Sequence, residues 1–171
     1  AVVVEPCGPA DLPDDGLART HLLDDPYAVL LPADSPHATK AEVDLADLAA
    51  EPWVQTASAP GHCHEAAQAA CLAAGFTPSY AVLADEYPTT QRFVAAGLGV
   101  ALVPRLALGL VHERVVVRPL ERRRGVQPVR HVYAAVRAAR SGEALVRTAL
   151  DALRVAADGL RGAWPDGPAP D

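Results

Sequence analysis

The sequence has no methionine, one lysine, three cysteines and few aromatic residues. Aromatics make up 5% of the 171 residues, too few for a stacking platform that binds single-stranded nucleic acid. Fifteen basic residues face 21 acidic ones, and a net charge of −6 does not provide the basic surface of a nucleic-acid-binding domain. No apolar run has the length of a membrane span, and no signal peptide is recognisable. These absences argue against nucleic-acid binding by this chain alone and against a membrane protein.

The residues that are present are typical of a folded domain, since half are hydrophobic and 21% are charged. Cys7, Cys63 and Cys71 are widely spaced and include no CxxC pair, which predicts reduced thiols in the cytoplasm. Basic residues other than Lys40 are all arginine, and alanine, valine and proline are abundant, as in bacteria with GC-rich genomes. The first residue is alanine and a β-branched run follows at once, so we interpret the chain as part of a longer protein.

Strand-like and helix-like segments alternate in the middle of the chain. We predict strands over 53–56, 79–84 and 100–103, and helices over 62–74 and 89–96. This βαβαβ order predicts a parallel sheet with helices on its faces. Gly75 is expected at the C′ position of the first helix. Gly97-Leu98-Gly99 follows a helix and lacks a third glycine, which predicts a helix cap and a tight turn rather than a dinucleotide-binding loop.

The flanking segments do not continue this alternation. We expect further strands over 1–5, 18–23, 27–31, 114–120 and 129–138, a short helix over 45–50 capped by Asp44, and a long helix over 143–160. The Arg122-Arg123-Arg124 run is expected at the solvated turn of a hairpin. If the segments before and after the central lobe pack together, the chain must cross between the two parts twice. This predicts an α/β fold of two lobes, an architecture that can close around a ligand.

Four segments carry a more specific signal. They are 22–38 (LLDDPYAVLLPADSPHA), 43–54 (VDLADLAAEPWV), 73–78 (AAGFTP) and 93–104 (FVAAGLGVALVP). In this order and spacing they resemble the effector-binding domain of LysR-type transcriptional regulators over about residues 1–160, and the last segment is the most specific. Members of that family carry a helix-turn-helix domain, a linker helix and the start of the first lobe before the region that this chain matches.

The resemblance implies two Rossmann-like lobes of the periplasmic-binding-protein type, joined by two crossover strands, with the first lobe incomplete. Residues 1–34 would form part of lobe I, and residues 35–104 would form lobe II. The chain would then return to lobe I over 105–161, which includes the C-terminal helix, and 162–171 would be a disordered tail. The hinges would lie at Pro32, Val103 and Pro104.

The loops that follow the central strands are the expected effector site. The first loop opens a helix, where free backbone N–H groups attract anions. Its candidate residues are Ser58, Ala59, Pro60, Gly61 and His62, and the alternative is an ordinary strand–helix turn. The second loop follows the neighbouring strand at the same sheet edge. Its candidates are Tyr87, Thr89 and Thr90, and the alternative is that Thr89 only caps a helix.

Outside these loops, two further residues are candidates and one apparent site is rejected. Val4 and Glu5 end the first strand at the same cleft, although Glu5 is also explained as a solvated strand end. His62 and His64 flank Cys63 but would point about 200° apart on a helix, so we predict no metal site there. No nucleophile has a positioned base beside it, and we expect neither catalysis nor a cofactor.

The sequence thus predicts a bacterial, cytoplasmic ligand sensor. A small-molecule effector, for which a carboxylate is one candidate, would bind between the lobes without being transformed. The full-length protein would be a homodimer or homotetramer that contacts DNA only through its N-terminal domain. The alternatives are a periplasmic-type solute-binding protein, which would need a secretion signal, and a dehydratase of aromatic biosynthesis, which would need an acid–base pair.

Overall fold

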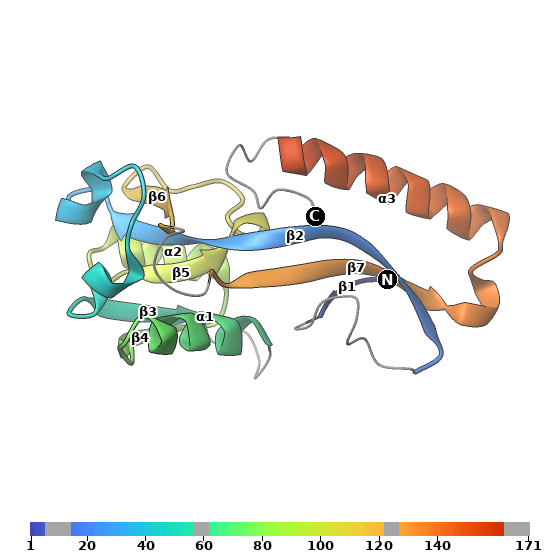
Figure 1. Cartoon of the computed structure of the whole chain (residues 1–171). Coiled ribbons are helices and arrows are strands. Elements are labelled where there is room, and N and C mark those ends of the chain that lie inside the picture. The colour runs from blue at the N-terminus through green and yellow to red at the C-terminus, as the bar shows by residue number, and fades with distance from the viewer. Residues whose placement is uncertain (6–14, 57–61, 122–126, 163–171) are drawn as a thin grey trace. The chain divides into compact units, whose positions relative to one another are not determined.

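The computed structural model describes residues 1–5, 15–56, 62–121 and 127–162 (Figure 1). By its internal contacts the chain divides into two units, Ala1–Asp25 with Arg130–Asp171, and Pro26–Val129. Strand β2 (Leu17–Pro32) runs through both, and β7 (Val129–Arg137) begins at the second passage. The prediction that the chain crosses twice between its parts is therefore confirmed. None of the helices in the described residues has the length and apolar character needed to span a membrane.

The unit formed by the two ends of the chain contains a small sheet and one long helix. β1 (Val2–Glu5) pairs antiparallel with β7, which in turn neighbours β2. Helix α3 (Ala144–Gly162) follows the short 3-10 turn η5 (Ala138–Arg140). Its buried contacts come from positions one helical turn apart, Leu150, Leu153 and Ala157, which pack with Leu22, Leu23, Val132 and Ala134. Leu145 and Val155, by contrast, are 83% and 73% exposed.

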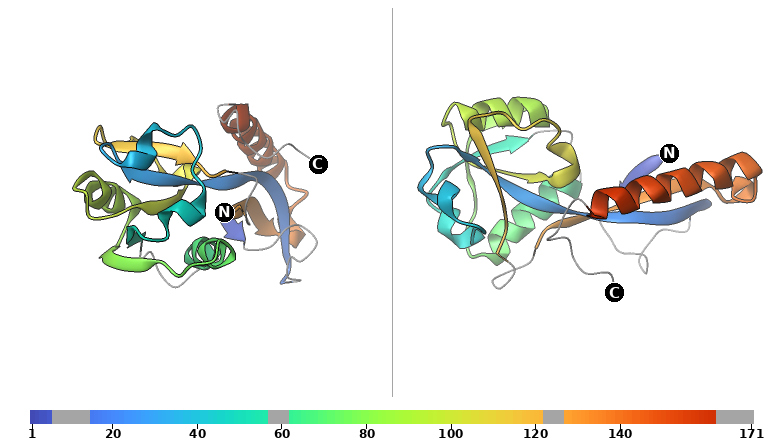
Figure 2. Two further views of the ribbon diagram at one scale, coloured as in Figure 1. Left: turned by 60° about the vertical axis from the view of Figure 1, so that its left-hand side comes forward. Right: turned by 90° about the horizontal axis from the view of Figure 1, so that it is seen from above.

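The other unit is built around two parallel strands. β3 (Pro52–Thr56) and β4 (Ser79–Ala84) pair in parallel and are connected by α1 (His62–Ala73). Helix α2 (Tyr87–Ala95) then leads to β5 (Ala101–Pro104). Trp53, Ala70 and Cys71 belong to one core cluster, whereas Val54, Ala84 and Val94 belong to the other. The two helices thus cover opposite faces of the strands, as predicted (Figure 2).

Antiparallel strands and short helical turns complete this unit. β5 and β6 (Val115–Pro119) both pair antiparallel with the second half of β2. The turns are η2 (Pro36–Thr39), η3 (Leu45–Leu48) and η4 (Arg105–Ala107). Asp44 caps η3 as predicted, because its carboxylate accepts a hydrogen bond from Ala46 N–H at 3.0 Å. The helix itself is shorter than the predicted 45–50, since it is a single 3-10 turn over Leu45–Leu48.

Strand β2 corrects the prediction of two separate strands at 18–23 and 27–31. The chain continues extended through Asp24-Asp25-Pro26. Asp25, a residue type that favours turns, is fully buried and accepts a hydrogen bond from Arg130 Nε at 2.6 Å. Tyr27 N–H donates to the Pro128 carbonyl at 3.1 Å, so the ladder resumes directly after the proline. Partners from distant parts of the chain thus override a local turn signal.

The third strand of the predicted parallel unit is also different. Val100 forms a parallel bridge with Trp53, and Val54 N–H donates to its carbonyl at 2.8 Å. The residues after it, however, pair antiparallel with β2. The expected hairpin between 114–120 and 129–138 is wrong as well, because in the described residues β6 pairs with β2 and β7 pairs with β1. The arginines at 122–124 lie outside the described residues.

The glycine turns are confirmed. Gly75 ends α1 and Gly97 ends α2, both with positive φ, and Leu98 N–H donates to the Phe93 carbonyl at 3.1 Å. Gly99 has a φ of +152°, and a Cβ atom there would lie 2.4 Å from the Pro52 carbonyl oxygen. This close approach allows Val100 to reach β3, so a glycine is required for packing and not for phosphate binding.

The unit Pro26–Val129 is wider than the predicted lobe of 35–104, because the second half of β2 and the whole of β6 pair within it. The proposed hinge residues Pro32, Val103 and Pro104 all lie in strands of this unit. Their hinge role, and the division of the chain into lobes at 34 and 104, stay predictions. Of the expected tail, Gly162 ends α3 and 163–171 lie outside the described residues.

Candidate functional site

The carboxyl ends of β3 and β4 meet at one edge of the sheet because the two strands are parallel. Thr56 is the last residue of β3, and Thr90 lies in the first turn of α2. Their hydroxyl oxygens are 2.7 Å apart. The Thr90 hydroxyl also donates to the Glu86 carbonyl at 3.2 Å, so we assign Thr56 as the donor of the shared bond. Thr56, which precedes the first predicted loop, therefore contacts α2, the helix that begins in the second predicted loop.

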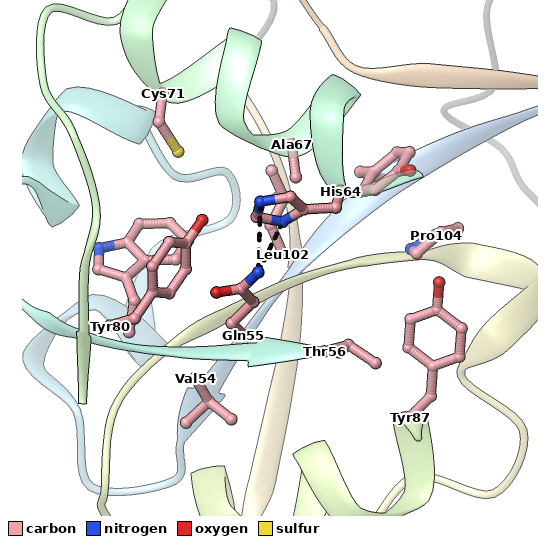
Figure 3. Close-up of a pocket in the computed structure, with 12 residues that line it drawn as sticks. Val54, Gln55, Thr56, His64, Ala67, Cys71, Tyr80, Tyr87, Leu102 and Pro104 are labelled. Carbon is pink, nitrogen blue, oxygen red and sulfur yellow. Dashed lines mark hydrogen bonds between the residues drawn. The ribbon is translucent and has the colours of Figure 1, made fainter. Parts of the chain in front are cut away.

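A hollow lies beside this edge, within the unit Pro26–Val129 (Figure 3). Its volume is about 450 Å³ when open solvent is counted, and about 30 Å³ of this is enclosed space. Four aromatic side chains, three polar ones and five others line it: Tyr27, Trp53, Tyr80, Tyr87, Gln55, Thr56, His64, Val54, Ala67, Cys71, Leu102 and Pro104. An apolar wall with a few polar groups is the usual composition of a small-molecule site.

The polar side chains Gln55, Thr56 and His64 come from β3 and α1, and Tyr80 adds a phenol from β4. The Gln55 side-chain amide lies 3.1 and 3.2 Å from the two ring nitrogens of His64, and Figure 3 shows this contact facing the space between the helix and the strand. Burial raises the pKa of the Tyr80 phenol, and the nearby Cys71 raises it further. Tyr80 is therefore a neutral hydrogen-bond donor at physiological pH, and it offers a ligand no negative charge.

Cys71 is a buried free thiol at the back of this hollow. Burial raises the pKa of the thiol to about 11. The reactive form of cysteine is the thiolate, which this environment disfavours. Cys71 is thus a packing residue of the α1 face rather than a nucleophile.

We expect iodoacetamide to alkylate Cys71 about 100-fold more slowly in the native protein than in the urea-unfolded chain at pH 8, since a pKa near 11 reduces the thiolate fraction by about that factor. Peptide mass spectrometry would follow Cys71 separately from Cys7 and Cys63. Equal rates in the folded and unfolded protein would contradict the protected environment described above.

Comparisons with known proteins identify the family. A family model described as "LysR substrate binding domain" matches residues 1–158. The chain belongs to this family. The small neutral protease regulatory protein of Streptomyces coelicolor is 35% identical over 112 residues, which are 66% of this chain and 34% of that protein. The chain thus spans about a third of the length of this curated relative.

Solved structures agree with this assignment. The reduced OxyR regulatory domain from Pseudomonas aeruginosa has a TM-score of 0.69 and 25% identity, covering 90% of this chain and 71% of that one. The C-terminal domain of a probable LysR family regulator from Rhodococcus sp. RHA1 has a TM-score of 0.65 and 28% identity, covering 84% and 70%. The fold is therefore the two-lobed, periplasmic-binding-protein-like fold of LysR effector-binding domains. The chain is a ligand-sensing domain of this type, and a solute-binding protein is not favoured.

The three candidates of the second predicted loop differ in burial and in whether they line the hollow of this LysR domain. Tyr87 lines the hollow, and Thr90 is fully buried against Thr56. Thr89 lies half-buried in the first turn of α2. The helix begins at Tyr87 with Glu86 as its N-cap, so the alternative in which Thr89 is the cap is wrong. The early start follows from Pro88, which fits the first turn of a helix.

The remaining candidates lie elsewhere. Ser58, Ala59, Pro60 and Gly61 are outside the described residues, and of His62 only its position at the start of α1 is described. Val4 belongs to the unit that contains α3 and packs against its core cluster. Glu5, in the same unit, accepts a hydrogen bond from Arg19 Nε at 2.8 Å.

The side chain of Glu5 is 17% exposed, so the interpretation of Glu5 as a solvated strand end is wrong. The same arginine pairs with Asp15 at 2.7 Å, which holds Glu5 in a small ionic cluster. A part for Val4 and Glu5 in effector binding stays a prediction.

Gln55, His64 and Tyr80 line the hollow but were not predicted from the sequence. Gln55 and Thr56 immediately precede the predicted loop, so the strand-end argument applied to the loop would also have selected them. The position of His64 beside His62 and Cys63 suggested only a metal ligand. Tyr80 carried no signal, because its position in β4 is that of an ordinary strand residue.

Proposed function

We propose that this LysR domain binds a small-molecule effector with a carboxylate at the carboxyl ends of β3 and β4. The observation that carries the proposal is the hydrogen bond between Thr56 and Thr90, since it joins the segments that flank both predicted loops. The BenM effector-binding domain, whose structure contains benzoate, and the CcmR regulatory domain, whose structure contains 2-PG, have TM-scores of 0.71 with this chain.

Each candidate residue has a proposed part in this site. The hydroxyls of Ser58 and Thr89 and the backbone N–H groups at Gly61 and His62 would hold the carboxylate. Ala59 and Pro60, which have small side chains, would leave room for its approach. Tyr87 and the aromatic wall of the hollow would contact the apolar part of the effector, while Thr90 fixes the edge through Thr56.

The domain would act within a longer cytoplasmic regulator. We propose that the regulator is a homodimer or homotetramer whose N-terminal domain binds DNA, and that the effector changes DNA affinity without being chemically altered. Coupling of this kind requires only that the effector favour one of two arrangements of the domain, because the difference in its affinity sets the shift in population. The regulatory protein of Streptomyces coelicolor supports this context.

A panel of small carboxylic acids, benzoate included, tests the site by thermal denaturation of the purified chain. An acid at about 100 times its Kd should raise the Tm by about 5–10 °C, since binding then adds about 2.7 kcal/mol. Ser58→Ala and Thr89→Ala should each weaken binding about tenfold or more, because each removes a hydrogen bond to a charged group.

Thr77→Ala is the matched control, as Thr77 is an exposed threonine two residues before the start of β4, away from the carboxyl end of that strand. It should leave the response unchanged. Stabilisation that neither Ser58→Ala nor Thr89→Ala reduces would show that the effector binds elsewhere. A panel without any stabilising acid would contradict carboxylate chemistry.

A further inference from the structure

Two histidines and an aspartate converge in the unit that contains α3, and none of them lines the hollow described above. His21 and Asp24 lie on β2, and His131 lies on the neighbouring strand β7. Asp24 Oδ1 is 2.8 Å from His21 Nε2 and 2.6 Å from His131 Nδ1. One ligand atom from each of the three side chains lies within 4.8 Å of the other two.

We propose that His21, Asp24 and His131 form a binding site for one divalent transition-metal ion, for which Zn²⁺ is the best match. Two imidazole nitrogens and one carboxylate oxygen are ligands that zinc accepts, and a three-residue set leaves one tetrahedral position for water. The inference is independent of the proposed effector site, because it concerns other residues in the other unit.

The distances suit this ion once the three ligand atoms, which all lie within 4.8 Å of one another, adjust to an even spacing. Zinc ligands at 2.0–2.1 Å in a tetrahedron are about 3.3 Å apart. The contacts at 2.6 and 2.8 Å would therefore open by about 0.5–0.7 Å as the ion replaces the shared hydrogen bonds. The two histidine nitrogens already face a common oxygen, so binding requires loss of their protons and little reorientation.

Exposure and charge also favour a cation. The side chains of His21, Asp24 and His131 are 36%, 33% and 26% exposed, so an ion can reach them from solvent. The arginines nearby in the sequence, Arg19 and Arg130, are ion-paired with carboxylates. The charge of these arginines is therefore compensated locally, and Asp24 adds a negative charge of its own.

Neighbouring residues hold the histidines in place. Tyr133 meets the ring of His21 edge-on with a centroid distance of 5.2 Å. His131 lies opposite Glu5 in the register of β1 and β7. Ligands on two hydrogen-bonded strands are positioned more accurately than ligands on loops, which raises the affinity of a site of only three protein ligands.

The test is isothermal titration calorimetry of the metal-free chain with ZnCl₂. We expect one equivalent of Zn²⁺ to bind. His21→Ala and His131→Ala should each weaken Zn²⁺ binding at least tenfold, because loss of a residue that only hydrogen-bonds to a metal ligand already lowers metal affinity by about 10- to 100-fold. Asp24→Asn should have the same effect while retaining an oxygen that accepts the histidine hydrogen bonds. It therefore separates metal binding from a structural role, and circular dichroism would verify that it is folded.

His112→Ala is the control, because His112 is a half-buried histidine outside the cluster. It should leave the Zn²⁺ affinity unchanged. Cobalt(II) in place of zinc should give d–d bands without a thiolate charge-transfer band, which excludes binding by cysteine. Absence of a one-equivalent isotherm, an unchanged affinity in all three cluster variants, or a thiolate band would each overturn the proposal. The carboxylic-acid panel is measured in buffers freed of metal ions by a chelating resin, so failure of either proposal leaves the other intact.

Discussion

Replacing Gly99 with alanine is expected to lower the free energy of unfolding by about 2–5 kcal/mol. The added Cβ atom would lie 2.4 Å from the Pro52 carbonyl oxygen and 3.2 Å from Trp53 N, and both of these atoms belong to the backbone. Neither can turn aside as a flexible side chain would. Relief of the clash requires Val100 to withdraw from β3, which breaks its hydrogen bonds to Pro52 and Val54. Guanidinium unfolding followed by circular dichroism would measure the loss.

Gly97→Ala separates the clash from the cost of the backbone conformation. Gly97 has a φ of +75° with open space around its Cβ position, so its replacement should cost only about 1–2 kcal/mol. Equal losses for the two variants would mean that the approach of Gly99 to β3 is not tight in solution.

Trp53→Ala is expected to cost about 3–5 kcal/mol, which is the range for removal of a large buried aromatic side chain. Trp53 is 2% exposed and stacks at a tilt against Phe76, with the ring centroids 5.8 Å apart. Its indole N–H donates to the Leu48 carbonyl at 3.2 Å and thereby fastens η3 to β3. Chemical denaturation followed by far-ultraviolet circular dichroism would give the difference.

Trp53→Phe tests the two contributions separately. It keeps most of the apolar contact but loses the hydrogen bond, and we expect a cost of about 1–2 kcal/mol. If phenylalanine were as destabilising as alanine, the indole hydrogen bond and not the packing would dominate at this position.

The sequence predicted the elements whose signals are local. The order from β3 to α2, the cap at Asp44 and the glycine helix ends were predictable because each depends on residues close together in the sequence. The parallel pairing of β3 with β4 followed from the strand–helix–strand order. The continuity of β2 was not, since Asp25 is satisfied by Arg130, a residue 105 positions away. The same limit applies to β5, whose main partner is β2 rather than the strand that precedes it in the predicted unit.

The candidate sites follow the same division. Tyr87 follows a predicted strand and was found by that argument, whereas Gln55 and His64 meet only because α1 folds back over β3. Asp24 and His131 are 107 residues apart, and no spacing rule links them. These two residues meet because β2 and β7 are neighbouring strands, and no local pattern in the sequence indicates that pairing.

The ion pair between Asp25 and Arg130 has a mechanical consequence. The chain leaves the first unit after Asp25 and returns to it at Arg130. These two residues form an ion pair, with Arg130 Nε 2.6 Å from the Asp25 carboxylate, whose side chain has no exposed surface. Separating these two residues would break this buried ion pair, and loss of a buried ionic partner costs about 3–5 kcal/mol. The ion pair therefore ties β2 to β7 at the two points where the chain passes between the units.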